Sequence, residues 1–256
     1  MDIIIFGGQS NMQGQTEGLP LKNESIKNAR EYHIIGDELI DLKHPVGEDY
    51  YPEIGLMAAS EGGGSLIPSF CKAYVEETGR EVVAIHAARG NTKLSTWLKG
   101  TPRYEYVAKK IQSGIKKVQQ ENEIKHIYYV WLQGESDAIN GTTAEEYYKG
   151  LKEYKNSLKQ EFGIEKFGII KVGYFYSISQ WHTHISTFEE KKACDEAVML
   201  GQELAVKRDS DFIMLTRICT EMSLIPKYIN PNASGHYNNL AMDIIGLEAG
   251  MALAKL

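Results

Sequence analysis

The feature that most constrains the fold of this chain is a regular alternation of helix-like and strand-like segments. Over four stretches, apolar residues recur at helical spacing, and each stretch is followed by a short, mostly apolar run of strand length. Alternation of this kind is typical of parallel sheets whose strands are connected by helices. The four pairs are 66–77 with 81–87, 103–121 with 126–132, 144–162 with 168–176, and 189–207 with 211–218.

Together with an opening strand at residues 2–6 and a closing helix at 239–255, these pairs predict an α/β fold. The expected architecture is a three-layer αβα sandwich of flavodoxin-like type, with a parallel sheet of about five strands. A stretch at 31–42 alternates around a central Gly-Asp pair, which predicts a small β-hairpin inserted at the surface as an accessory flap. The length of 256 residues fits a single domain over residues 1–256.

Composition and charge exclude several classes of protein. Hydrophobic residues make up 43% of the chain, but no apolar run is long enough to cross a bilayer, so we expect no membrane association. A formal net charge of −6 provides no basic surface for a nucleic acid. The three cysteines are far apart, which argues against a disulfide framework. Because residues 2–6 already form a strand, we expect a cytoplasmic protein, or a secreted one if a leader preceded Met1.

The first strand leads into the segment that carries the most chemistry. Ile3–Phe6 runs directly into two glycines, which are followed by Gln9, Ser10 and Asn11. This pattern predicts a buried strand that delivers Ser10 to a sharp turn, where the glycines allow close approach of a ligand. If a helix begins at Asn11, its N–H groups can stabilise an oxyanion beside Ser10. Ser10 is therefore a candidate nucleophile, although the same residues could simply cap a helix.

Other candidate residues follow the ends of the remaining predicted strands. Ligands of parallel sheets bind beyond the carboxyl ends of the strands, so we expect these residues to lie at one rim of the sheet with Ser10. They are Gly90 after the second strand, Gln133 to Asp137 after the third, Trp181 and His182 after the fourth, and His236 beyond the fifth.

Several of these segments resemble, in the right order, the motifs of a known family. The blocks are Gly8-Gln9-Ser10-Asn11-Met12, His86-Ala87-Ala88-Arg89-Gly90-Asn91-Thr92 and Trp131-Leu132-Gln133-Gly134-Glu135-Ser136-Asp137, followed by His236. They resemble the sialate O-acetylesterase and acetylxylan esterase branch of the SGNH (GDSL-like) hydrolases, similar to carbohydrate esterase family 6. The resemblance spans nearly the whole chain and implies an SGNH-hydrolase fold without a metal or cofactor.

The resemblance implies a role in acyl transfer for each rim residue. Ser10 would be the nucleophile, and His236 would be the base that takes its proton. The backbone N–H groups of Ser10 and Gly90 and the side-chain amide of Gln133 would hold the oxyanion, with Asn91 as an alternative to Gly90. Each such donor typically contributes on the order of 3 kcal/mol to transition-state stabilisation.

The chain departs from the family pattern at the acid that orients the histidine. The family usually carries an aspartate three residues before the histidine, where this chain has Ala233. Glu135 is the best substitute because it lies at the same rim, and Asp137 is the second candidate, although it could instead cap a helix. The chain could also use a Ser10–His236 dyad without an acid, or it could have lost its esterase activity.

Four further residues are expected to contact the substrate. Gln9 precedes the candidate nucleophile, and Asn91 follows the candidate oxyanion glycine. Trp97 and Trp181 could each offer a flat face to a sugar ring, or could equally well be packing residues. The two histidines after Trp181 have no other His or Cys cluster to support them, so we expect no metal site.

These features predict a serine esterase that removes O-acetyl groups from acetylxylan-type or sialate-type carbohydrates through an acyl-enzyme. Its expected partner is an acetylated carbohydrate substrate. A non-catalytic glycan-binding protein is the alternative from another class, and the alanine at position 233 motivates it. A lipid or thioester hydrolase of the wider superfamily is a third hypothesis, and it would require a longer acyl pocket.

Overall fold

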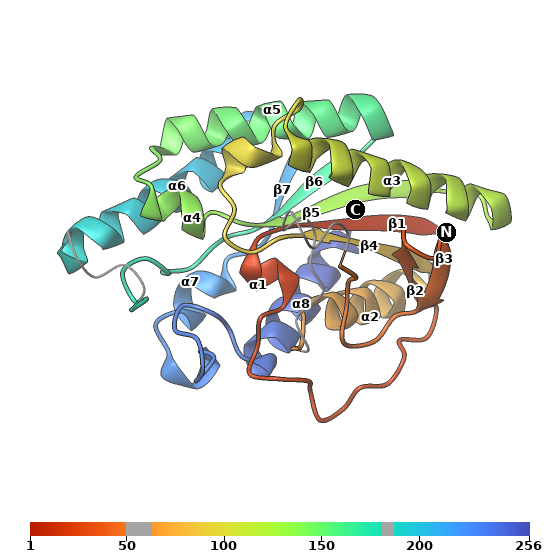
Figure 1. The fold of residues 1–256 in the computed structure, drawn as a ribbon, viewed down its shortest axis with the longest axis horizontal. Coiled ribbons are helices and arrows are strands. Elements are labelled where there is room, and N and C mark those ends of the chain that lie inside the picture. Colours follow the sequence, from red (N-terminus) through yellow and green to blue (C-terminus); the bar gives the residue numbers. More distant parts are fainter. Residues whose placement is uncertain (50–62, 181–186) are drawn as a thin grey trace.

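The computed structural model describes residues 1–49, 63–180 and 187–256. They build an α/β fold in which seven strands form one sheet, in the order β3-β2-β4-β1-β5-β6-β7 (Figure 1). Neighbouring strands are parallel except for the antiparallel pair β2 and β3. The strands are β1 (Asp2–Gly8), β2 (Ala29–His33), β3 (Glu38–Asp41), β4 (Val82–Ala88), β5 (His126–Leu132), β6 (Lys166–Ile170) and β7 (Phe212–Thr216).

Strand β1 occupies the centre of the sheet. All seven of its residues are buried, and Ile5 pairs with Ile85 of β4 on one side and Tyr129 of β5 on the other. A strand covered on both faces is apolar throughout, which explains why Ile3–Phe6 shows no alternation in the sequence. The carboxyl end of β1 therefore reaches the rim in the middle of the sheet, between the ends of β4 and β5.

The predicted hairpin is not a separate flap, because its two strands extend the sheet. Strand β2 pairs in parallel with β4, beginning with Ala29 opposite Val82, and β3 pairs with β2 on the outer side. This pairing uses backbone groups along the edge of β4 and buries Tyr32 completely, whereas a detached flap would leave both exposed to water. The sheet consequently has more strands than the sequence predicted.

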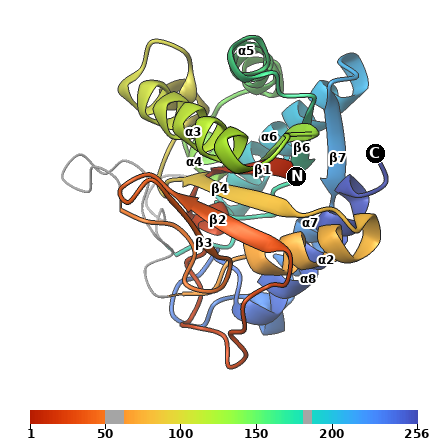
Figure 2. The same ribbon diagram turned by 90° about the vertical axis from the view of Figure 1, so that its right-hand side faces the viewer.

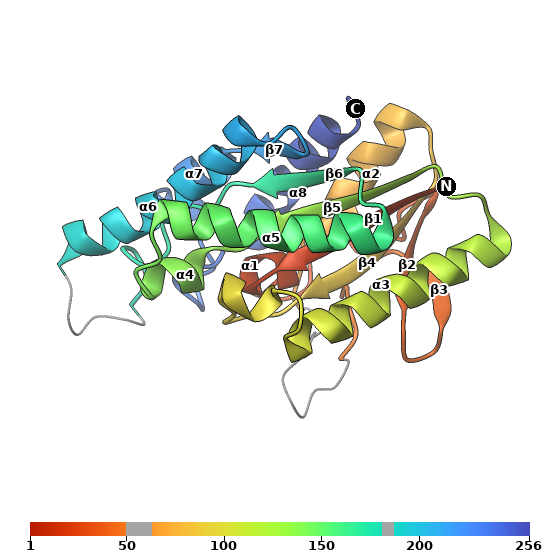
Figure 3. The same ribbon diagram turned by 90° about the horizontal axis from the view of Figure 1, so that it is seen from above.

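Helices cover both faces of the sheet (Figure 2). Helices α3 (Pro102–Glu121) and α5 (Ala144–Phe162) lie over one face, and α2 (Ile67–Thr78) and α8 (Asn239–Leu253) lie over the other. Figure 3 shows α6 (Phe188–Arg208) beside α5. The short elements are α1 (Ser10–Gln13), α4 (Glu135–Ile139), α7 (Ile218–Met222) and the 3-10 helices η2 (Leu94–Trp97) and η3 (Pro226–Tyr228).

Local sequence signals set the ends of the long helices. Helix α5 begins with a capping box between Thr143 and Glu146, and it ends at Gly163, whose φ of 69° is left-handed. Helix α6 begins with a second capping box, between Thr187 and Glu190. Within the described ranges, no helix is both long and apolar enough to span a membrane.

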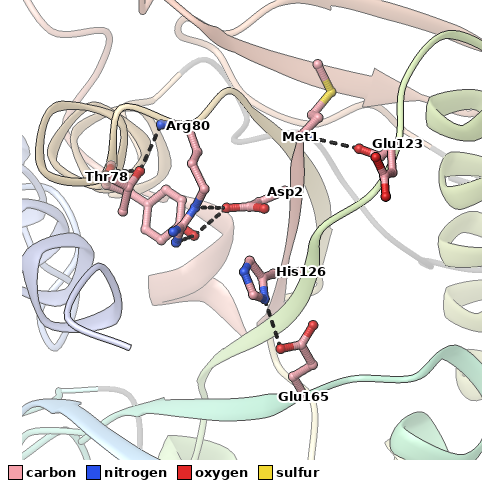
Figure 4. A network of polar contacts seen from close by, with 8 residues as sticks. Met1, Asp2, Thr78, Arg80, Glu123, His126 and Glu165 are labelled. Atoms are coloured by element: carbon pink, nitrogen blue, oxygen red, sulfur yellow. Dashed lines mark hydrogen bonds and ion pairs between the residues drawn. The ribbon is translucent and has the colours of Figure 1, made fainter.

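Polar contacts hold the end of the sheet that lies opposite the rim (Figure 4). Buried Asp2 accepts hydrogen bonds from the Tyr74 hydroxyl and from Arg80 Nε, each at 2.6 Å. Nearby, His126 Nδ1 lies 3.0 Å from the Glu165 carboxylate. The pairing with Arg80 offsets the cost of removing the Asp2 charge from water. The contacts of Asp2 therefore hold the first residue of β1 to α2 and to the residue two positions beyond that helix.

Candidate active site

The turn after β1 presents Ser10 as the first residue of α1. Gly8 has a φ of 146° and no space for a side chain, because a Cβ atom would lie 2.1 Å from the Leu132 carbonyl oxygen. Gly14, with a φ of 97°, ends the helix after one turn. The N–H of Ser10 lies in the first turn, where a helix provides no internal acceptor. Ser10 thus combines a hydroxyl with a backbone donor that its own helix does not use.

The loop between η3 and α8 brings His236 to Ser10. His236 Nε2 lies 2.8 Å from Ser10 Oγ, although 226 positions separate the two residues in the sequence. The His236 backbone is fixed on both sides, since its N–H donates to Ala233 and its carbonyl accepts from the Asn230 N–H. The ring packs edge-on against Phe175, with 5.5 Å between centroids. Ser10 and His236 are 5% and 8% exposed, so the pair is shielded from water but reachable from the rim.

Glu135 lies close to this pair but contacts Asn11 rather than His236. Its Oε1 accepts a hydrogen bond from Asn11 Nδ2 at 2.8 Å, and its buried Oε2 has no hydrogen-bond partner among the described residues. Burial raises the pKa of Glu135, the hydrogen bond from Asn11 opposes this effect, and the charge of Asp195 adds to the rise. The predicted direct contact between Glu135 and the imidazole is therefore not made in this structure.

Gln133 lies beneath the site, where it joins several segments. Its Nε2 donates to the Thr92 carbonyl at 2.7 Å and to Asp137 Oδ2 at 2.6 Å, and it lies 3.2 Å from Gln9 Oε1. Its Oε1 accepts from the Tyr147 hydroxyl at 3.0 Å, and the residue has no exposed surface. Both amide hydrogens point at protein acceptors in this structure. The oxyanion role of Gln133 therefore stays a prediction, and it would require one of these hydrogen bonds to be released.

Asp137 is also occupied away from the histidine. Its Oδ2 accepts from the Leu94 N–H at 2.8 Å in addition to Gln133, and its Oδ1 accepts from Thr142. Burial raises the pKa of Asp137, and these hydrogen bonds act against that rise. Asp137 therefore anchors the loop after β4 to α4, and it does not orient His236.

Gly90 lies directly against the nucleophile. A Cβ atom at Gly90 would be 3.4 Å from the Cβ of Ser10, and the Gly90 N–H donates to Gln13 Oε1 at 2.8 Å. Gly90 thus lies beside Ser10, but a side chain of α1 accepts the hydrogen bond of its N–H, so its oxyanion role stays a prediction. The alternative, Asn91, is exposed and has a left-handed φ of 56°. Gln9 is buried, and its Oε1 accepts from the Ser136 N–H at 3.1 Å.

Trp97 is a core residue rather than a surface for a sugar ring. It is 0% exposed, packs edge-on against Trp131 with 5.2 Å between centroids, and donates from Nε1 to Thr92 Oγ1 at 3.1 Å. A fully buried ring offers no face to a ligand, so the predicted substrate contact does not hold. The other predicted platform, Trp181, lies outside the described residues, as do the two histidines that follow it.

Three residues of the site were not assigned a role from the sequence. Asn11 stands next to Ser10 in the first motif, but no sequence pattern shows where its amide points. Phe175 lies after β6 and packs on the His236 ring. Asp195 of α6 accepts hydrogen bonds from the N–H groups of Tyr176 and Ser177, and so fixes the loop that carries Phe175. Phe175 falls inside the predicted strand 168–176, but β6 ends at Ile170, so no sequence signal marked this segment as a rim loop.

The described part of the chain contains no group of three or more His, Cys, Asp or Glu side chains that could hold a metal ion. The chemistry available from the residues present is nucleophilic attack by Ser10, proton transfer by His236, and stabilisation of negative charge by backbone N–H groups. This combination is suited to acyl transfer.

Comparison with known proteins gives a family and a fold. The model of a family described as carbohydrate esterase, sialic acid-specific acetylesterase matches residues 1–213. Among curated proteins, none matches this sequence.

Several solved structures share the fold over nearly the whole chain. A protein from Arabidopsis thaliana has 17% identity and a TM-score of 0.70, over 98% of this chain and 96% of that one. NanS has 13% identity and a TM-score of 0.65 over the same shares. A variant of Axe2, an acetyl xylan esterase from Geobacillus stearothermophilus, has 10% identity and a TM-score of 0.52, over 98% of this chain and 95% of that one.

Proposed function

We propose, from the premise that the chain belongs to the carbohydrate esterase family of sialic acid-specific acetylesterases, that it hydrolyses O-acetyl esters of a sugar through an acyl-enzyme on Ser10. Family membership makes the chain a carboxylic ester hydrolase of SGNH type, as its motifs predicted. The proposed substrates are acetylated sugars of the acetylxylan or sialate type, in line with the family and with its structural neighbours NanS and Axe2.

The observation that carries the proposal is the 2.8 Å separation of His236 Nε2 and Ser10 Oγ. A serine hydroxyl is a weak nucleophile near neutral pH, and an unprotonated imidazole nitrogen at this distance can take its proton during attack. The neutral ring must then carry its own proton on Nδ1. The pair can therefore start acyl transfer without a further group entering the site.

In the proposed reaction, Ser10 Oγ attacks the acetyl carbonyl carbon while its proton moves to His236 Nε2. The Ser10 N–H stabilises the oxyanion, and the Gly90 N–H joins it when Gln13 releases its hydrogen bond. The bond to the sugar then breaks, and His236 donates the proton to the leaving sugar oxygen. Water attacks the acetyl-enzyme with His236 again as base, which releases acetate and restores Ser10.

The first prediction concerns Ser10→Ala, tested on p-nitrophenyl acetate. Loss of the nucleophile should lower kcat by at least ~10³-fold, while the thermal unfolding midpoint stays close to wild type. Ser157→Ala, a partly exposed residue of α5 whose hydroxyl donates to the Glu153 carbonyl, is the matched control and should keep full activity. Undiminished hydrolysis by Ser10→Ala would exclude this nucleophile. A wild-type chain that binds acetylated sugars without releasing acetate would instead support the glycan-binding alternative.

A further inference from the structure

We propose that Asn11 positions His236 by clamping the histidine's backbone, and that Glu135 fixes the clamp. Asn11 is thus a positioning residue for the reaction, because it contacts the backbone groups on both sides of the base. The inference rests on the proposed function only in assigning His236 as the base for Ser10, and it goes beyond that function in saying what holds the base.

The Asn11 side chain joins three segments of the rim. Its Nδ2 donates to Glu135 Oε1 at 2.8 Å, and the Gly235 carbonyl oxygen lies 3.5 Å from the same nitrogen. Its Oδ1 accepts from the Tyr237 N–H at 3.3 Å. The two backbone groups are those immediately before and after His236. One amide therefore contacts both neighbours of the base, from the position that directly follows Ser10.

The orientation of the Asn11 amide is determined by its partners. A carboxylate and a carbonyl accept hydrogen bonds and an N–H donates one, so nitrogen must face Glu135 and oxygen must face Tyr237. Glu135 supplies the short contact of the three, and a charge-assisted hydrogen bond to a carboxylate is stronger than one between neutral groups. Removing the Glu135 acceptor would thus loosen the hold of Asn11 on the loop.

Burial makes this contact important for both partners. Asn11 is 1% exposed and Glu135 is 3% exposed, so neither has water to replace a lost hydrogen bond. A hold on the backbone keeps Nε2 within reach of Ser10 Oγ, because the ring moves with the loop that carries it.

The experiment compares Asn11→Ala, Asn11→Asp, Glu135→Gln and the double variant Asn11→Asp/Glu135→Gln. In each we would measure kcat and KM, the pH profile of kcat/KM, and the rate at which a fluorophosphonate labels Ser10. The labelling rate reports the activation of Ser10 by His236 even if no sugar ester is hydrolysed, so failure of the proposed function is distinguished from failure of this inference. Asn156→Ala, on the exposed side of α5, is the control.

A displacement of about 1 Å at a reacting centre can cost ~100-fold, so Asn11→Ala should lower kcat and the labelling rate by about 10- to 100-fold with little change in KM. Asn11→Asp places two carboxylates together and should lose at least as much. Adding Glu135→Gln should restore part of this loss, because a carboxamide at 135 can donate to a carboxylate at 11. In the single variants, the basic limb or the midpoint of the pH profile of kcat/KM should shift from its wild-type position.

Two results would overturn the inference. One is an Asn11→Ala enzyme whose kcat and labelling rate equal those of wild type. The other is a double variant whose loss equals the product of the two single losses, since residues linked in one network are not additive. If Asn11 were merely structural, the variants would melt earlier, but the fraction that labels with fluorophosphonate would react at the wild-type rate and with the wild-type pH profile.

Discussion

Amide side chains hold the rim together at the scale of single residues. Asn11 links the nucleophile's helix to the histidine loop, and Gln133 links β5 to the loop after β4 and to α4. An amide can donate and accept at the same time, so one side chain satisfies groups from several segments. Because these groups are buried, each lost partner costs more than the hydrogen bond itself contributes.

The Gln133→Ala variant tests this account at the residue scale. It would remove the Gln133 donor from the Thr92 carbonyl and one of several donors from the Asp137 carboxylate, so the free energy of unfolding should fall by about 3 kcal/mol. Urea unfolding measures this change, with Gln160→Ala on α5 as an exposed control. A variant with wild-type stability and a turnover reduced by several hundredfold would instead make Gln133 an oxyanion donor.

The sequence could place residues at the rim but could not show how their side chains point. Ser10 and His236 both follow strands, and the rule for parallel sheets brings the ends of those strands together. Gln133 follows a strand as well, but its amide turns inward because Asp137 lies one helical turn further on. Trp97 likewise follows a rim loop, but its ring packs against Trp131 in a buried aromatic cluster. Direction depends on packing partners that are distant in the sequence.

At the scale of elements, the junction of β1 and α1 decides where the nucleophile lies. Strand β1 is paired on both sides, so its end cannot shift without breaking hydrogen bonds to β4 or β5. Gly8 completes the strand, and the Gln9 N–H donates to the Leu132 carbonyl. The turn is therefore tied to β5 up to the residue before Ser10.

Gly8→Ala is the corresponding prediction. The new Cβ would collide with the Leu132 carbonyl oxygen at an unfavourable φ, so we expect a loss of stability of about 3 kcal/mol and a fall in kcat of at least ~10-fold. Gly100→Ala is a matched control, because Gly100 also has a positive φ but nothing within 4 Å of a Cβ atom. Thermal unfolding and ester hydrolysis measure both effects. Equal effects of the two variants would show that contact with β5 does not position the turn.

Helices and strands with strong periodicity were predictable from the sequence. The pairing of the hairpin with the edge of the sheet was not. The helices and the five buried strands are visible because their patterns follow the burial they experience. The hairpin at 31–42 showed its own alternation. Nothing in its local sequence shows that its first strand pairs with β4, which would otherwise have a free edge. Edge pairing depends on the strand order of the whole sheet, which local patterns do not contain.

At the scale of the whole molecule, buried histidines link stability to pH. His86 of β4 is 0% exposed, and burial lowers its pKa from 6.5 to about 3. The pKa of His44 is shifted in the same direction, to about 4. The unfolded chain binds these protons near pH 6.5, but the folded chain does not until much lower pH. The stability they contribute is thus complete above 6.5 and is lost as the pH falls towards the folded values.

His86→Leu should flatten this acid decline. One such group changes the free energy of unfolding by about 1.4 kcal/mol per pH unit within its window, so the wild-type curve should fall more steeply than the variant curve as the pH is lowered. Urea unfolding at a series of pH values below neutral gives both curves. Carboxyls with raised pKa, such as Glu135 and Asp195, have the opposite slope, but they are present in both proteins and cancel in the difference. Parallel curves would contradict a neutral, buried His86.

The most direct test of the central proposal is to trap the acyl-enzyme. Wild-type protein mixed with p-nitrophenyl acetate and quenched in acid during turnover should gain the mass of one acetyl group, and peptide mapping should locate it on Ser10. The Ser10→Ala variant should gain none. Turnover without acetylation of Ser10, or an acetyl group on another side chain that accounts for turnover, would contradict the assignment of Ser10 as the nucleophile that His236 activates.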